Sequence, residues 1–244
     1  MSSEKNLKDK KKKRKIGSNF CYDVLKWFGI WPALIWLRPK RIFPHGKKRV
    51  KGGVLVCANH RSFLDPLIVH CAILGRRLNC LATKDLYDTK KKARFFNLMN
   101  CIMVDKENFS LSSFHTVVEK LQDKKVVVIF PEGQVNREET GGVLAFKSGA
   151  VFMAHKSGAP ILPMYIVKRE KWYERQKIVI GEPFDVRDAL GAIPTLEKLT
   201  TVSEQLRIKE VELSEYYEAH FPKSKKKVAA RGEENKENKE KELV

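Results

Sequence analysis

The residues best suited to acid–base chemistry are His60 and Asp65, in the stretch from Asn59 to Asp65. His60 is the only one of the six histidines with an aspartate five positions later. A carboxylate bonded to one imidazole nitrogen fixes the tautomer of the ring, and the other nitrogen can then take a proton from a hydroxyl. No serine or cysteine stands in the context of a nucleophile elbow. The hydroxyl can therefore belong to a substrate.

A second group of polar residues follows another apolar run, at Phe130-Pro131-Glu132-Gly133. A turn directly after a strand would place the carboxylate of Glu132, free backbone N–H groups and the cation of Arg137 at one edge of a sheet. The same residues also suit an ordinary type I or II turn with an exposed glutamate. Two further edges of the predicted sheet carry Val104-Asp105-Lys106 and the stretch from Gly158 to Pro163.

The polar residues must be held by secondary structure, and short apolar runs typical of strands alternate along the sequence with segments of helical periodicity. Buried strands are predicted at Val50–Ala58, Leu78–Thr83, Cys101–Val104, Val126–Phe130, Ile161–Val167 and Lys177–Ile180. Helices are predicted at Pro66–Leu74, Lys91–Met99, Ser110–Gln122, Phe146–Lys156 and Thr195–Phe221. Strands that alternate with helices of this length predict an α/β fold, a mostly parallel sheet covered by helices. Ligands of such sheets bind beyond the carboxyl ends of the strands, so the polar groups should meet there.

Together these blocks resemble the lysophospholipid acyltransferase family, of the 1-acyl-sn-glycerol-3-phosphate acyltransferase type, over about residues 20–185. The resemblance rests on N-H-x-x-x-x-D at Asn59 to Asp65, a strand ending at Lys106, F-P-E-G at Phe130 to Gly133 and a proline-containing strand at Ile161 to Pro163. The first and third blocks in combination are specific to the family, whereas the second and fourth mean little alone.

The resemblance implies a reaction and roles for particular residues. His60 would act as the general base on a glycerol hydroxyl, with Asp65 orienting it, and the hydroxyl would attack the thioester of acyl-CoA or acyl-carrier protein without an acyl-enzyme. The most natural acceptor is 1-acyl-sn-glycerol-3-phosphate, which gives phosphatidic acid. No cofactor or metal is expected. The implied substrate-binding residues are Asn59, Arg61, Ser62, Lys106, Glu132, Gly133 and Arg137.

The sequence departs from the family pattern at two basic positions. Val135 stands where the third block commonly has arginine, with Arg137 two residues later, and Lys106 stands where the second block commonly ends in arginine. Arginine and lysine are not interchangeable in bidentate phosphate recognition. An acyltransferase of the same family that acts on another lysolipid is therefore an alternative.

The 244 residues carry a formal net charge of +19, which predicts an anionic partner. Residues 1–15 and 223–244 are predicted to be charged disordered tails. A basic nucleic-acid binding module is a competing hypothesis, but no basic strand interleaved with aromatic residues and no recognition helix supports it. We therefore expect an anionic membrane surface as partner and no nucleic acid. A family member that binds lipid without catalysis is a third hypothesis, against which the intact His60 and Asp65 argue.

The segment from Phe20 to Leu37 is rich in tryptophan. As one helix its 18 residues would span roughly 27 Å, just short of a bilayer core. Asp23, Lys26 and Pro32 argue against a simple span and favour an interfacial hairpin of two short amphipathic helices. The predicted organisation is thus a tail at 1–15, a membrane-interface segment at 16–45, an acyltransferase domain at 46–222 and a tail at 223–244.

The cysteines indicate the compartment. The five are scattered, mostly within apolar runs, and form neither a CxxC pair nor a Cys/His ligand set. This pattern is typical of a reducing compartment. We expect a peripheral or monotopic protein of the cell membrane, with its active site facing the cytoplasm.

Overall fold

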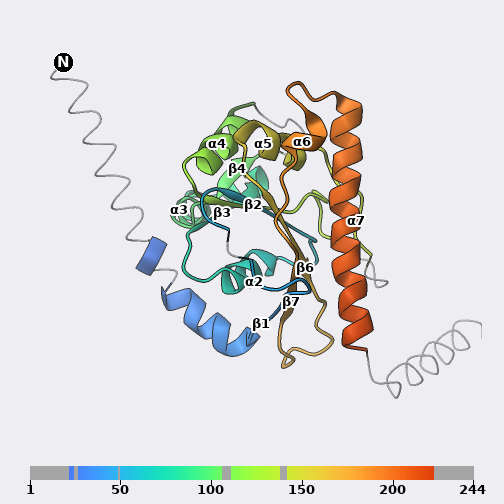
Figure 1. Cartoon of the computed structure of the whole chain (residues 1–244). Coiled ribbons are helices and arrows are strands. Elements are labelled where there is room, and N and C mark those ends of the chain that lie inside the picture. The colour runs from blue at the N-terminus through green and yellow to red at the C-terminus, as the bar shows by residue number, and fades with distance from the viewer. Residues whose placement is uncertain (1–21, 25–26, 49, 106–110, 138–141, 223–244) are drawn as a thin grey trace, which may run out of the picture.

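A computed structural model describes residues 22–24, 27–48, 50–105, 111–137 and 142–222 (Figure 1). The tails predicted at 1–15 and 223–244 lie outside the described residues, and so does Lys106. Their predicted roles stay predictions.

The described residues form one seven-stranded sheet with the order β1-β7-β6-β2-β5-β3-β4. Strands β2 to β6 run parallel to one another, whereas β7 is antiparallel to β6 and parallel to β1. The predicted mostly parallel α/β fold is confirmed. The strands are β1 (Lys40–Ile42), β2 (Val54–Ala58), β3 (Leu78–Thr83), β4 (Ile102–Val104), β5 (Val126–Ile129), β6 (Ile161–Ile166) and β7 (Lys177–Ile180).

Helices cover both faces of the sheet, because the inner strands are apolar on both sides. In β2, Val54, Val56 and Ala58 pack toward α2 and the helix at 27–37, whereas Leu55 and Cys57 pack toward α4, α5 and α7. Figure 1 shows these two layers of helices on either side of the strands. The helices are α2 (Asp65–Ala72), the 3₁₀ helix η1 (Lys84–Tyr87), α3 (Lys90–Leu98), α4 (Leu111–Gln122), α5 (Gly149–Ser157), α6 (Arg187–Leu190) and α7 (Leu196–His220).

The N-terminal segment is helical at residues 22–24 and 27–37. The break predicted at Pro32 is wrong, because the chain is helical on both sides of it. A proline removes one backbone hydrogen bond, to the carbonyl four residues earlier, and Phe28 at that position is 80% exposed, so water can hydrate the unpaired carbonyl. The connection at 25–26 lies outside the described residues, so the hairpin stays a prediction. Among the described residues, no helix has the length and hydropathy that a bilayer crossing requires.

Strand β1, the 3₁₀ helix η1, helix α6 and the observed start of α5 were not predicted. Strand β1 is only three residues long, and Lys40 and Arg41 are exposed, so no apolar pattern marks it; pairing with β7 forms the strand. Helix α5 begins at Gly149 rather than at Phe146. Its predicted end is confirmed, since Gly158 caps the helix in the left-handed region at φ +67°, where a side chain would be strained.

Candidate active site

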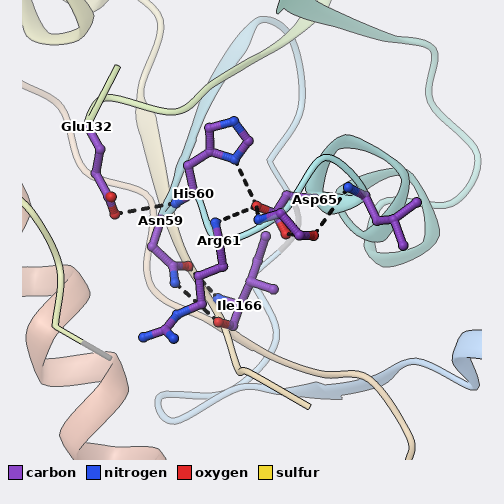
Figure 2. Close-up of polar contacts among 8 residues, drawn as sticks. Asn59, His60, Arg61, Asp65, Glu132 and Ile166 are labelled. Carbon is purple, nitrogen blue, oxygen red and sulfur yellow. Dashed lines mark hydrogen bonds and ion pairs between the residues drawn. The ribbon is translucent and has the colours of Figure 1, made fainter. Parts of the chain in front are cut away.

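His60 and Asp65 lie together beyond the carboxyl end of β2, the central strand of the sheet. His60 Nδ1 lies 2.8 Å from Asp65 Oδ2 (Figure 2). The imidazole stacks on the ring of Phe130 at the end of β5, with centroids 4.3 Å apart. No hydrogen bond to His60 Nε2 comes from any part of the chain that the structure describes. The ring is thus held on one edge and one face, and Nε2 is available to a ligand.

Asp65 is the best-anchored carboxylate of the site and is 1% exposed. Besides the His60 ring, its Oδ2 accepts hydrogen bonds from the backbone N–H groups of Arg61, at 2.6 Å, and Ser62, at 2.7 Å. The Ser62 hydroxyl donates to Oδ1 at 3.0 Å. Pro66 supports this arrangement, because it lies in the first turn of α2, where the missing N–H costs no helical bond. The turn at residues 60–65 is therefore held together by hydrogen bonds from its own residues to the carboxylate of Asp65.

Asn59 joins this turn to the neighbouring strand. Its side-chain amide donates to the carbonyl of Ile166 at 3.2 Å and accepts from the Ile166 N–H at 2.7 Å, and the residue is 1% exposed. Both polar ends of the side chain are thus occupied by the end of β6. The contacts of Asn59 are those of a residue that fixes the end of β2, rather than of one that meets a substrate.

The loop after β5 brackets His60 on the other side. Glu132 Oε1 accepts a hydrogen bond from the His60 N–H at 3.3 Å, and the Asn136 N–H donates to the His60 carbonyl at 2.6 Å. Gly133 closes the turn by donating from its N–H to the Phe130 carbonyl, at φ +71°. The first and third sequence blocks, 72 residues apart, therefore meet at the backbone of one histidine.

Glu132 is buried in an unusual electrostatic setting. Its Oε2 has no hydrogen-bond partner within the described ranges, and the side chain is almost inaccessible. Burial raises the pKa of Glu132 to about 7, an effect that hydrogen bonding to the His60 N–H opposes. Glu210 of α7 interacts electrostatically with it, and burial raises the pKa of Glu210 well above its ordinary range. The structure thus brings two buried carboxyl groups beneath the candidate site.

The predicted basic residues are placed differently. Arg137 is exposed and follows Asn136 directly, so it lies next to the loop that holds His60. The side chain of Arg61 points away from the His60 ring, as Figure 2 shows, and only its backbone N–H contacts Asp65.

Lys147 is a cation at the site that the sequence prediction missed. Its N–H donates to the Pro131 carbonyl, and its side chain crosses Gly133. No local pattern marks this lysine, since 14 residues separate it from Gly133. The role of Phe130 as a stacking partner was also not predicted.

The arrangement can remove a proton from a hydroxyl at His60 Nε2 while Asp65 stabilises the charge that develops on the ring. No cluster of three or more potential metal ligands occurs in the parts of the chain that the structure describes. An acid–base reaction needs only the residues already placed.

Comparison with known proteins decides the family. The family model described as Acyltransferase matches residues 41–167, more than half of the chain and the whole of the site. This chain belongs to the acyltransferase family. The predicted family and enzyme class are confirmed.

Similar proteins agree with this assignment. The acyltransferase is 29% identical over 167 residues to the 1-acyl-sn-glycerol-3-phosphate acyltransferase of Bacillus subtilis, covering 66% of this chain and 81% of that protein. It is 26% identical to a protein of Caenorhabditis elegans named putative 1-acyl-sn-glycerol-3-phosphate acyltransferase acl-2, covering 85% and 72% of the two chains. The crystal structure of the 1-acyl-sn-glycerophosphate acyltransferase PlsC of Thermotoga maritima superposes with a TM-score of 0.57 at 20% identity, over 87% of this chain and 85% of that one. The last likeness supports the fold.

Proposed function

We propose that this acyltransferase moves a fatty acyl group from acyl-CoA or acyl-carrier protein to the free hydroxyl of 1-acyl-sn-glycerol-3-phosphate, giving phosphatidic acid. The observation that carries the proposal is the His60–Asp65 pair, with Nε2 available, in a chain whose relatives bear the name of this activity. Because the acceptor brings its own hydroxyl, the enzyme needs no nucleophile of its own.

The proposed reaction proceeds in two proton-coupled steps. His60 Nε2 takes the proton of the acceptor hydroxyl as the oxygen attacks the thioester carbonyl carbon. The tetrahedral intermediate then collapses, the carbon–sulfur bond breaks, and the imidazolium returns its proton to the leaving thiolate. Asp65 remains a carboxylate throughout, holding Nδ1–H and stabilising the imidazolium. The ester and the free thiol are the products.

The remaining predicted site residues divide into two proposed roles. Asn59 and Ser62 position the His60–Asp65 turn, as their hydrogen bonds to Ile166 and Asp65 suggest. The backbone of Arg61 and the side chain of Glu132 support the same turn. Gly133, Arg137 and Lys106 would line the acceptor site.

The proposed partner surface is an anionic membrane, approached through the helix at 27–37. Trp27, Phe28 and Trp31 are 64%, 80% and 53% exposed on it. A cavity of about 740 Å³ beside this helix has apolar walls and a basic rim that includes Lys124 and Lys125. Aromatic side chains with neighbouring cations are typical of interfacial helices. Since β1 pairs within the sheet, membrane contact in the range 16–45 would be confined to residues before it.

The proposed cytoplasmic orientation of the site rests on the cysteines. Cys57, Cys71, Cys80 and Cys101 are free thiols, and the first three are buried. Unpaired thiols persist in a reducing compartment.

The decisive experiment replaces His60 by glutamine and measures acyl transfer to 1-acyl-sn-glycerol-3-phosphate from acyl-CoA and from acyl-carrier protein. We expect a loss of at least about 10³-fold with the melting temperature little changed, because the imidazole is a partly exposed loop side chain. His115→Gln is the matched control, since His115 is exposed on α4. Retained activity in the His60 variant would contradict the mechanism. A panel of other lysolipids in the same assay tests the alternative acceptor.

A further inference from the structure

Lys147 crosses the turn that holds His60. Its Nζ and Cε lie 3.0 Å and 2.9 Å from the position that a Cβ atom at Gly133 would occupy. Its backbone N–H donates to the Pro131 carbonyl at 3.0 Å, so both the backbone and the side chain of Lys147 are fitted to the Pro-Glu-Gly turn. Glycine at 133 is favoured by φ +71°, where a side chain would be strained, and a Cβ atom there would also displace the end of the Lys147 side chain.

This turn lies against the catalytic histidine. Residues 132 and 136 bond the N–H and the carbonyl of His60, and Gly133 stands between them. The ammonium of Lys147, which stands just before α5, therefore lies against the loop that contacts the backbone of the proposed base. Lys147 is exposed, and within the described ranges no acceptor lies at hydrogen-bond distance from its Nζ. A cation in this position is available to an anionic ligand.

We infer that Lys147 binds the phosphate of the acceptor and thereby sets the preference for a phosphomonoester over uncharged or zwitterionic acceptors. The inference rests on the proposed function and names its specificity residue. Val135, two residues beyond Gly133, presents an exposed apolar side chain that cannot pair with an anion. Lys147 supplies from the opposite side of the turn the charge that Val135 lacks.

A point charge suits this ligand. The phosphomonoester of 1-acyl-sn-glycerol-3-phosphate carries close to two negative charges at neutral pH, whereas a phosphodiester headgroup carries one. An ammonium with three donors can follow a rotating phosphate without the fixed plane of a guanidinium. Arg137, exposed on the same loop, adds a second positive charge to this edge of the sheet.

The test compares Lys147→Met, which keeps the length of the apolar stem, with Lys147→Arg, which keeps the charge. We expect the KM for 1-acyl-sn-glycerol-3-phosphate to rise about tenfold in Lys147→Met, with the KM for acyl-CoA unchanged, and Lys147→Arg to recover most of the loss. Lys198→Met is the control, because Lys198 is exposed in the first turn of α7, outside the turns that hold His60. An unchanged acceptor KM, or an equal rise in the donor KM, overturns the inference.

A binding measurement separates this inference from the proposed reaction. Saturation-transfer NMR with sn-glycerol 3-phosphate as the probe requires no acyl transfer. Binding that Lys147→Met loses and Lys198→Met retains supports the inference, even if the wild-type protein fails to transfer an acyl group and the proposed function falls. Equal binding by both variants, or no binding by the wild type, overturns it.

Discussion

At the residue scale, Glu132 shows how a site group can be held in place at a cost in stability. Its Oε1 supports the His60 backbone, while the opposite oxygen is buried without a partner among the described residues. An isolated buried carboxylate is unfavourable, and its protonation relieves the penalty. The turn is therefore held by a group whose charge state depends on pH near neutrality.

Glu132 should make the fold less stable as pH rises. Its pKa is raised from 4.5 to about 7, so the folded state binds the proton more tightly than the unfolded state. The resulting stability is present below pH 4.5 and is lost as pH rises through about 7. Glu132→Gln keeps the acceptor for the His60 N–H and should remove this loss, on the order of 2–3 kcal/mol between pH 5 and 8.5.

Urea unfolding at the two pH values measures the effect. Glu119→Gln, an exposed carboxyl on α4, is the control and should retain the pH dependence of the wild type. The same slope in Glu132→Gln and in the wild type would show that Glu132 titrates normally.

At the element scale, helix α7 buries one carboxyl group, that of Glu210, without a hydrogen-bond partner among the described residues. Glu210 is 0% exposed, and neither of its oxygens has a hydrogen-bond partner within the described ranges. A helix of 25 residues whose other buried positions are mostly apolar can tolerate one such group. The packing of α7 against α5, α6 and β6 must offset the free-energy cost of burying Glu210.

Replacing Glu210 by methionine should stabilise the protein. The substitution keeps the length of the side chain and removes a buried group that must stay protonated or remain unpaired. We expect the free energy of unfolding to increase by about 1–3 kcal/mol at pH 7.5, and by less at pH 5, because the raised pKa of Glu210 makes the wild type lose stability as pH rises. Thermal unfolding at both pH values provides the measurement. Glu212→Met, on the exposed side of the same helix, should change stability little; a destabilised Glu210→Met would mean that the carboxyl has a favourable role.

Elements with strong apolar patterns could be predicted from the sequence, and elements formed by pairing could not. Strand β2 is fully buried and was identified by its β-branched run. Strand β1 exists through its partner β7, and the helix at 27–37 continues through Pro32 because its outer face is exposed. For the site, the spacing of His60 and Asp65 predicted that the two side chains meet, and His60 Nδ1 lies 2.8 Å from Asp65 Oδ2. Lys147 and Glu210 reach the same place through tertiary packing, which local sequence does not encode.

At the scale of the whole molecule, the exposed aromatic residues and the net positive charge both lead us to expect binding to an anionic membrane. The net charge of +19 and the exposed face of the helix at 27–37 both favour an anionic bilayer. Apolar side chains that enter the interface gain about 1.5–3 kcal/mol each when fully buried.

A triple variant tests the membrane contact. Trp27→Ser, Phe28→Ser and Trp31→Ser combined should weaken binding to vesicles of phosphatidylglycerol and phosphatidylcholine at least about tenfold, as measured by cosedimentation. Ile193→Ser is the control, because Ile193 is 86% exposed between α6 and α7, away from this helix. Unchanged vesicle binding by the triple variant would exclude the helix as the contact. Retention on polynucleotide that exceeds retention on the vesicles, and that weakens steeply as salt is raised, would favour a nucleic-acid partner instead.

The hydrogen bonds of the turn after β2 also bear on how this protein can change by mutation. Asn59, His60, Ser62 and Asp65 are each committed to a specific bond, whereas Phe63, 71% exposed, and Leu64, 37% exposed, contribute only surface. In a saturation scan of residues 59–65 we therefore expect substitutions to be tolerated at Phe63 and Leu64 and to abolish activity at the four hydrogen-bonded positions. Substitutions at Phe63 and Leu64 can change the surface that a substrate meets without disturbing the hydrogen bonds of His60 and Asp65. Substrate preference can therefore change by mutation within this turn while the proposed chemistry is retained.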